Sequence, residues 1–188
     1  MINYRILAYS QEFYEGKGFK KIEVPWTVPQ EIINITKPID VKDEFYFPSK
    51  NKSFVGSAEQ GFLYLYLKDF ITQGKFQSIS PCLRNDSFDF LHTKYFMKNE
   101  LIITDDVSEK SLQEVIQNAL YFFGTYLVKN LLSVDQNSDE SYDINYNFNG
   151  KKIELGSYGI RSCEYLDWIY STGCAEPRLS RIIALQNK

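Results

Sequence analysis

The sequence predicts an α+β fold, in which strands joined mostly antiparallel are set apart from the helices. Residues 76–82 and 94–103 have strand character and are joined by a loop. Residues 107–132 repeat apolar side chains at helical spacing, which predicts a long amphipathic helix. An Asn-Gly pair at positions 149–150, between two more strand-like segments, is typical of a two-residue β-hairpin turn. A chain of 188 residues suits one domain of this kind.

Glycine and proline mark the ends of the elements in the first part of the chain. Gly16 and Gly18 end an N-terminal helix, and Pro25 ends the strand that follows it. A capping box that starts at Ser57 opens a helix that ends near Gly74. The predicted elements are a helix over 2–17, a strand over 19–26, a loop with a short strand over 34–51 and a helix over 57–74.

The second part of the chain alternates strand and helix patterns less regularly. Residues 133–140 are polar and predict a linker, and residues 161–170 have an ambiguous pattern. Pro177 opens a final helix, since proline is favoured in a first helical turn. The remaining predicted elements are strands over 142–148 and 152–155 and a last helix from 177 to about 186.

Composition excludes several classes of protein. Hydrophobic residues at 44% and charged residues at 24% exclude wholesale disorder. No apolar run reaches the ~18 residues of a membrane span, and the N-terminus has no signal-peptide pattern. Three widely spaced cysteines argue against a disulfide framework and predict a cytoplasmic location. A net charge of −3 argues against a dominant nucleic-acid surface, and a single histidine, His92, argues against a histidine-based metal site or triad.

Three segments have residue types that could support chemistry. Residues 18–25 form a helix exit and a strand that stops at a proline. Residues 80–86 and 96–101 form a strand-loop-strand in which Arg84 suits a phosphate or carboxylate and Phe96 suits a base. Residues 171–178 alternate small side chains before a helix whose N-terminus attracts anions. Each segment alone also fits an ordinary structural role as a helix-turn-strand, a surface hairpin or a tight strand-to-helix joint.

Together and in this order, the segments resemble the three signature motifs of class II aminoacyl-tRNA synthetases. Residues 80–84 (SPCLR) and 96–101 (FMKNEL) are most similar to seryl-type enzymes. Ser57 and Glu59 resemble a Thr-x-Glu loop, and Glu154 resembles the acid of a Glu-Ile-Ser-Ser strand. The resemblance covers the chain from about Arg5 onward. It implies an antiparallel sheet flanked by helices.

The resemblance also implies roles for five residues in binding ATP. Arg84 would hold the α-phosphate and the amino-acid carboxylate, and Arg178 would hold the γ-phosphate. Phe96 would stack on adenine, and Asp86 would contact the adenine amino group from a side chain one methylene shorter than the usual glutamate. Glu154 would help to hold Mg²⁺ on ATP.

The amino acid would be held by a second group of residues. Glu59 would bind the α-amino group, and Glu100 would contact the amino acid or the metal. Ser57 and Ser157 would complete this half of the site. Some seryl-like relatives bind zinc in this pocket, but we do not expect zinc here. Ser57 and Glu59 occupy the region where those relatives would have their first cysteine, and Cys82 and Cys174 lack a paired spacing.

Several departures leave alternatives open. Ser171 and Ala175 replace two motif glycines and would crowd the ATP floor. Arg181 is an alternative to Arg178 as the motif arginine. Glu59 could instead be an ordinary acid in a first helical turn. His92 matches a loop position of lysyl-type relatives, but a lone loop histidine is also commonly solvated.

Three functions fit these motifs. An enzyme that activates an amino acid with ATP and passes it to an acceptor, such as a carrier protein, predicts an open pocket on which Arg84 and Arg178 converge. A non-catalytic binding or regulatory paralogue predicts a pocket filled by side chains such as Glu176 or Tyr158. A minimal tRNA-acylating enzyme predicts a positive surface at the pocket mouth. We expect one catalytic domain over residues 1–188 without a separate tRNA-binding domain, and a homodimer through the strand that ends at Pro25.

Overall fold

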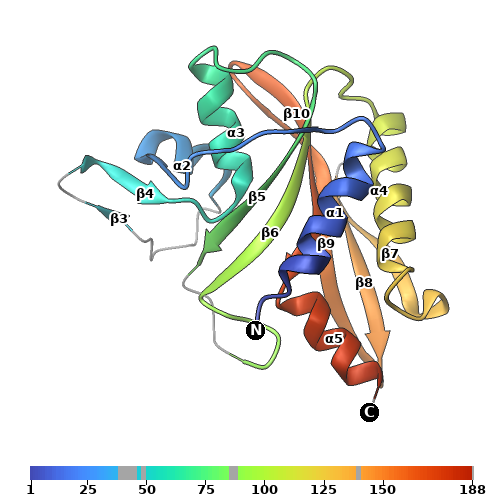
Figure 1. The fold of residues 1–188 in the computed structure, drawn as a ribbon. Helices are drawn as coiled ribbons and strands as arrows, with labels where there is room; N and C mark the ends of the chain where they lie inside the picture. Colours follow the sequence, from blue (N-terminus) through green and yellow to red (C-terminus); the bar gives the residue numbers. More distant parts are fainter. Residues whose placement is uncertain (38–45, 48–49, 85–88, 139–140, 188) are drawn as a thin grey trace.

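The computed structural model describes residues 1–37, 46–47, 50–84, 89–138 and 141–187, and it confirms the α+β class (Figure 1). A seven-stranded sheet has the order β1-β5-β6-β10-β9-β8-β7, and every neighbouring pair is antiparallel except β1 and β5. Its strands are β1 (Lys20–Lys21), β5 (Lys75–Leu83), β6 (Tyr95–Ile103), β7 (Leu132–Ser138), β8 (Ser141–Phe148), β9 (Lys151–Cys163) and β10 (Leu166–Glu176).

A small sheet and the helices surround this large sheet. The small sheet has the order β2-β4-β3, with strands β2 (Thr27–Pro29), β3 (Tyr46–Phe47) and β4 (Lys52–Phe54). The helices are α1 (Tyr4–Glu15), α2 (Gln30–Thr36), α3 (Ala58–Leu67), α4 (Glu109–Phe123), α5 (Arg178–Gln186) and the 3₁₀ helix η2 (Lys129–Leu131). None of the described helices has the length and apolar character that crossing a bilayer requires.

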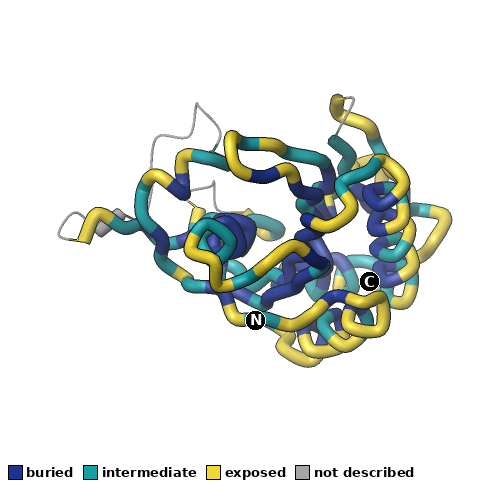
Figure 2. Tube along the Cα trace, turned by 90° about the horizontal axis from the view of Figure 1, so that it is seen from above, coloured by how far each residue is buried: buried dark blue, intermediate teal, exposed yellow. Residues whose placement is uncertain are grey.

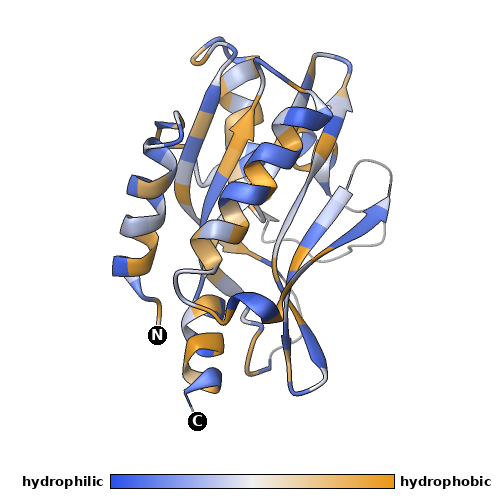
Figure 3. Cartoon of the chain, turned by 90° about the vertical axis from the view of Figure 1, so that its right-hand side faces the viewer, coloured by the Kyte–Doolittle hydropathy of each residue, from blue (hydrophilic) through white to orange (hydrophobic). Residues whose placement is uncertain are grey.

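Helices α1 and α4 pack side by side against one face of the large sheet (Figure 1). Apolar residues at helical spacing in α4, such as Leu112, Ile116 and Phe123, are fully buried there. From the sheet, alternate residues such as Leu101 and Ile103 of β6 join the same core. Buried segments therefore fill the interior in Figure 2, and orange and blue residues alternate along the helices in Figure 3.

The opposite face of the sheet is shared between α3 and a pocket. Helix α3 packs near Phe76, Ile102 and Trp168 in a second hydrophobic cluster. Because side chains alternate along a strand, Phe96 and Lys98 of β6 lie on the same face as Ile102, toward the other end of the strand. This strand thus presents apolar residues to α3 at one end and polar residues to the pocket at the other.

Several predicted elements differ from those observed. The strand expected over 19–26 is only β1, so Pro25 lies outside it. The expected linker over 133–140 is largely β7, an edge strand whose mostly polar, exposed side chains give no alternating pattern. The helix expected over 107–132 ends at Phe123 with Gly124 as its C-cap. The ambiguous segment 161–170 comprises the end of β9, the turn at residues 164–165 and the start of β10. The helix α2 was not predicted at all.

Candidate functional site

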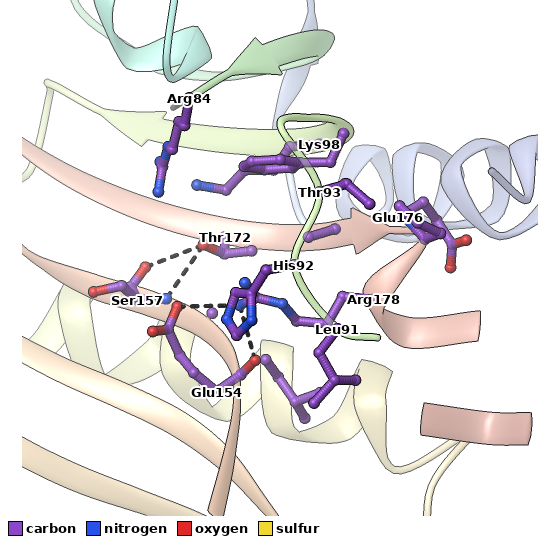
Figure 4. A pocket seen from close by; sticks show the side chains of 15 residues that line it. Arg84, Leu91, His92, Thr93, Lys98, Glu154, Ser157, Thr172, Glu176 and Arg178 are labelled. Carbon is purple, nitrogen blue, oxygen red and sulfur yellow. Dashed lines mark hydrogen bonds and ion pairs between the residues drawn. The ribbon is translucent and has the colours of Figure 1, made fainter. Parts of the chain in front are cut away.

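The large sheet carries a pocket of about 360 Å³ on the face opposite α1 and α4 (Figure 4). The end of β5 contributes Arg84, and β6 contributes Phe96 and Lys98. Strand β9 contributes residues 154–157. The end of β10 and the start of α5 complete the wall with residues that include Thr172, Ala175, Glu176 and Arg178. Five of the residues predicted from the motifs, Arg84, Phe96, Glu154, Ser157 and Arg178, therefore meet at one cavity.

Arg84 lies at one wall of the pocket, where its position is fixed by two contacts. Its Nε donates a hydrogen bond to the carbonyl oxygen of Gly56 at 2.9 Å. Its guanidinium carbon lies 5.4 Å from the centroid of the Phe96 ring, within the range of a cation–π contact. No carboxylate of the described residues forms an ion pair with Arg84. The group is therefore a positive charge available to an anionic ligand.

Arg178 lies at the other side of the pocket, at the first position of α5. Its Nη1 donates to the backbone oxygen of Glu154 at 3.1 Å and lies 3.6 Å from that residue's carboxylate. Arg181 instead donates to the carbonyl oxygen of Phe90 at 2.7 Å and does not line the pocket. Of the two candidate motif arginines, Arg178 is the one at the site.

The floor of the pocket is formed by closely packed small residues of β9 and β10. A Cβ atom added to Gly156 would lie 2.5 Å from the Cβ of Thr172, so only glycine fits there. The Ser157 N–H donates to the Thr172 hydroxyl at 3.2 Å. Ser171 does not line the pocket, and its buried hydroxyl donates to the carbonyl of Leu101 at 3.4 Å. The crowding expected from Ser171 is therefore absent, whereas Ala175 does line the pocket.

Glu59 is buried at the first turn of α3 and does not line the pocket. Its two carboxylate oxygens accept from Nη1 of Arg161 at 2.5 Å and from Nε1 of Trp168 at 2.7 Å. Burial raises the pKa of Glu59, and the two donors offset this effect only in part. The pairing of Arg161 with Trp168 in the β9–β10 register brings both donors to this carboxylate.

Glu100 is buried in β6 and is likewise outside the pocket lining. Its carboxylate accepts from the Ser57 hydroxyl and the Ala58 N–H, and Nζ of Lys98 lies 2.8 Å away. Burial disfavours the charged form of Glu100, but Lys98 and the two hydrogen bonds outweigh burial and lower its pKa. Ser57, Glu59 and Glu100 therefore form a buried polar layer beside the pocket.

Two further candidate site residues, His92 and Asp86, belong to the segment between β5 and β6. His92 lines the pocket, and its Nδ1 lies 2.8 Å from a carboxylate oxygen of Asp89. The side-chain hydrogen bond with His92 and two backbone hydrogen bonds lower the pKa of Asp89 to about 2. Asp86 lies outside the described residues.

Sequence reasoning missed Lys98, Thr172, Arg161 and Trp168. Lys98 could have been found, because it lies two residues from both Phe96 and Glu100 along one strand and therefore on the same face of the sheet. Arg161 and Trp168 gave no such signal, because their role depends on a register between strands that the sequence does not specify.

Comparison with known proteins identifies the fold. No protein-family model and no curated protein sequence matches the chain. Solved structures do match it. A seryl-tRNA synthetase from Pyrococcus horikoshii complexed with ATP has a TM-score of 0.75 at 16% identity, over 94% of this chain and 48% of that one. A cytoplasmic serine-tRNA ligase from Naegleria fowleri in complex with AMP has a TM-score of 0.74 at 17% identity, over 94% and 46%.

A third structure extends the likeness beyond seryl enzymes. PylSc from Desulfitobacterium hafniense, a pyrrolysyl-tRNA synthetase, has a TM-score of 0.72 at 13% identity, over 95% of this chain and 65% of that one. The chain thus spans about half the length of the two seryl enzymes. The order of the motifs and these similarities agree, and the chain has the fold of a class II aminoacyl-tRNA synthetase catalytic domain.

Proposed function

We propose that the pocket binds ATP and uses it to activate an amino acid or a closely related carboxylic acid as an acyl adenylate. The observation that supports this most strongly is the meeting of Arg84, Phe96 and Arg178 at one open cavity. Two of the similar structures hold ATP or AMP. A volume of about 360 Å³ lies within the usual range of small-molecule sites.

Each of these residues has a role that its chemistry supports. The planar fork of Arg84 suits two oxygens of the α-phosphate, and the face of Phe96 suits adenine. Arg178 would neutralise the γ-phosphate from the far side of the pocket. Adenylate formation needs no general base, because a carboxylate is already a nucleophile. Positioning and charge neutralisation therefore account for the catalysis.

Glu154 fits a metal ion that arrives with the nucleotide. Mg²⁺ is commonly bound by one or two carboxylates together with substrate phosphates. The Glu154 side chain is about half exposed at the pocket, and the described residues contain no cluster of three or more acidic, histidine or cysteine side chains. Glu154 would thus be the protein ligand, and the metal would withdraw charge from the phosphates.

The open cavity favours the activating enzyme, because a non-catalytic paralogue was expected to have its pocket filled by side chains. Tyr158 is buried on the other face of the sheet, where its hydroxyl donates to the carbonyl of Thr172 at 2.7 Å. Glu176 borders the pocket, but its carboxylate accepts from the Asn3 N–H and from Ser180. Neither side chain occupies the cavity in the way that the non-catalytic alternative requires.

The acceptor and the assembly are further parts of the proposal. We expect the activated acid to pass to a carrier protein, with tRNA as the alternative. We also propose a homodimer through the edge at β1, although the exposed lysines 20 and 21 on that edge oppose direct strand pairing. Sedimentation of the purified protein tests the dimer.

Calorimetric titration with ATP and Mg²⁺ tests the nucleotide site. We expect saturable binding, and Arg84→Ala should weaken it about 10- to 100-fold, the usual range for a charged hydrogen bond. Arg5→Ala is the matched control, since Arg5 is exposed on α1. Absence of binding at millimolar ATP, or equal binding by both variants and the wild type, would refute the proposed site. Exchange of pyrophosphate into ATP with candidate acids then identifies the substrate.

A further inference from the structure

Glu59 and Glu100 have carboxylates beside the pocket. These carboxylates determine which carboxylic acid the site can accept as a substrate. The resemblance to synthetases assigns Glu59 to a substrate ammonium group, and Glu100 to the amino acid or a metal. Such a role requires a carboxylate that faces the ligand and has no cation of its own. Neither residue meets this requirement, since both are buried and neither lines the pocket.

The Glu59 carboxylate is fully engaged within the chain. Arg161 provides a cation at 2.5 Å from one oxygen, and the Trp168 indole donates to the other at 2.7 Å. The Arg161 guanidinium is also held in place over the ring of Tyr170, at 4.1 Å from its centroid. A ligand ammonium would therefore meet a guanidinium that is held by two contacts, with Glu59 and with the Tyr170 ring.

The Glu100 carboxylate is engaged in the same way by a different cation. Lys98 lies 2.8 Å from one oxygen, and its side chain is only 12% exposed. The Ser57 hydroxyl donates to that oxygen and the Ala58 N–H to the other. Lys98 thus occupies, from within the protein, the position that a positively charged ligand group would need.

The two carboxylates that the resemblance assigns to the substrate acid are thus already neutralised by cations of the protein. Glu59 is paired with Arg161, Glu100 with Lys98 and Glu154 with Arg178, so each of these three acids has one basic partner. Glu176, at the α5 end of the pocket, instead accepts hydrogen bonds from the Asn3 N–H and from Ser180. Arg84 remains as a positive group without an acidic partner among the described residues. An entering ammonium would find Glu59 and Glu100 already paired, whereas a carboxylate would be attracted by Arg84.

We infer that the acid activated at this pocket lacks a free α-amino group, and is a hydroxy acid, an N-acylated amino acid or another carboxylic acid that is uncharged at that position. This inference depends on the proposed function. In the reaction, a carboxylate oxygen forms a bond to the α-phosphorus of ATP. The bond from that phosphorus to the bridging oxygen breaks, and pyrophosphate leaves with the electron pair.

A matched pair of adenylate analogues tests the inference. One is 5′-O-(N-L-serylsulfamoyl)adenosine, and the other is its 3-hydroxypropionyl counterpart, which differs only by the missing amino group. We expect the second compound to bind at least 10-fold more tightly in calorimetry. Equal affinity, tighter binding of the seryl compound, or no binding of either by a protein that binds ATP would overturn the inference. Failure to bind ATP would instead refute the proposed function.

A variant with less positive charge beside Glu59 gives a second test, in which the preference between the two analogues is measured again. Arg161→Gln keeps a donor for Glu59 but leaves this carboxylate without a cation, so the preference for the compound without an amino group should shrink at least threefold. Arg5→Gln, a change of the same type on the exposed surface of α1, should leave the preference unchanged. An unchanged preference in Arg161→Gln would contradict the role given to Arg161. If that variant does not fold, the comparison of the two compounds on the wild type decides.

Discussion

Replacing Lys98 by methionine should destabilise the protein by removing the cation that neutralises Glu100. The two side chains are 12% and 7% exposed, and their atoms lie 2.8 Å apart. Removing one partner of a buried ion pair costs about 3–5 kcal/mol of stability, because the other charge stays buried without compensation. The Ser57 hydroxyl and the Ala58 N–H still support Glu100, so we expect the lower end, about 3 kcal/mol at pH 7.

The loss should depend on pH in a specific direction. In the wild type the folded pKa of Glu100 is lowered, so its contribution to stability is present above the unfolded pKa of about 4.3 and is lost as pH falls through the folded pKa. Without Lys98, burial raises the folded pKa above the unfolded value, which makes ionised Glu100 destabilising. The difference between wild type and variant should therefore be largest near neutral pH. It should shrink as pH falls toward the unfolded pKa of about 4.3 and continue to shrink below it.

Urea unfolding at pH 7 and pH 4 measures both effects. A loss of about 3 kcal/mol corresponds to a melting temperature lower by about 6–12 °C for a chain of this size. Lys110→Met, at an exposed position of α4, is the control and should change stability by less than about 0.5 kcal/mol. The double variant Lys98→Met/Glu100→Gln should recover part of the loss. A loss that is the same at both pH values, or below about 1 kcal/mol at pH 7, would refute this reasoning.

Three further outcomes follow from the packing of the site. Gly156→Ala should cost about 1–3 kcal/mol in urea unfolding, because the added Cβ would lie 2.5 Å from Thr172, whereas Gly16→Ala at the C-cap of α1, with an ordinary helical φ of −63°, should be nearly neutral. Tyr158→Phe should cost about 1–3 kcal/mol by leaving the buried carbonyl of Thr172 without its donor, and an unchanged unfolding midpoint would contradict this. Burial raises the pKa of Cys82 to about 12 and that of Cys174 well above its usual value, so a thiol reagent at pH 8 should label Cys163 in the folded protein and the other two only after unfolding. Rapid labelling of more than one thiol in the folded protein would show that the core is more open than described.

Several residues that line the pocket could be predicted from the sequence because they belong to local motifs. Arg84 follows a strand, Phe96 lies on the next strand, and Arg178 opens a helix, so the fold brings them together once its strand order is known. The long amphipathic helix and the Asn-Gly hairpin were also readable, because periodicity and turn chemistry are local properties.

The surroundings of Glu59 could not be predicted, because they depend on residues that are distant in the sequence. Glu59 had the right type and position for a ligand carboxylate, but Arg161 and Trp168, about 100 residues further on, take both of its oxygens. Edge strand β7 escaped prediction for a different reason. It has a partner on only one side and mostly exposed side chains, so no apolar alternation marks it.

Arg84, Phe96 and Arg178 are proposed to bind one ATP molecule at the pocket. The most direct test is a crystal structure of the protein with Mg²⁺ and a non-hydrolysable ATP analogue. We predict adenine against the Phe96 ring, the α-phosphate at Arg84 and the γ-phosphate at Arg178. A nucleotide bound at another surface, or in this pocket without contact to either arginine, would contradict the account.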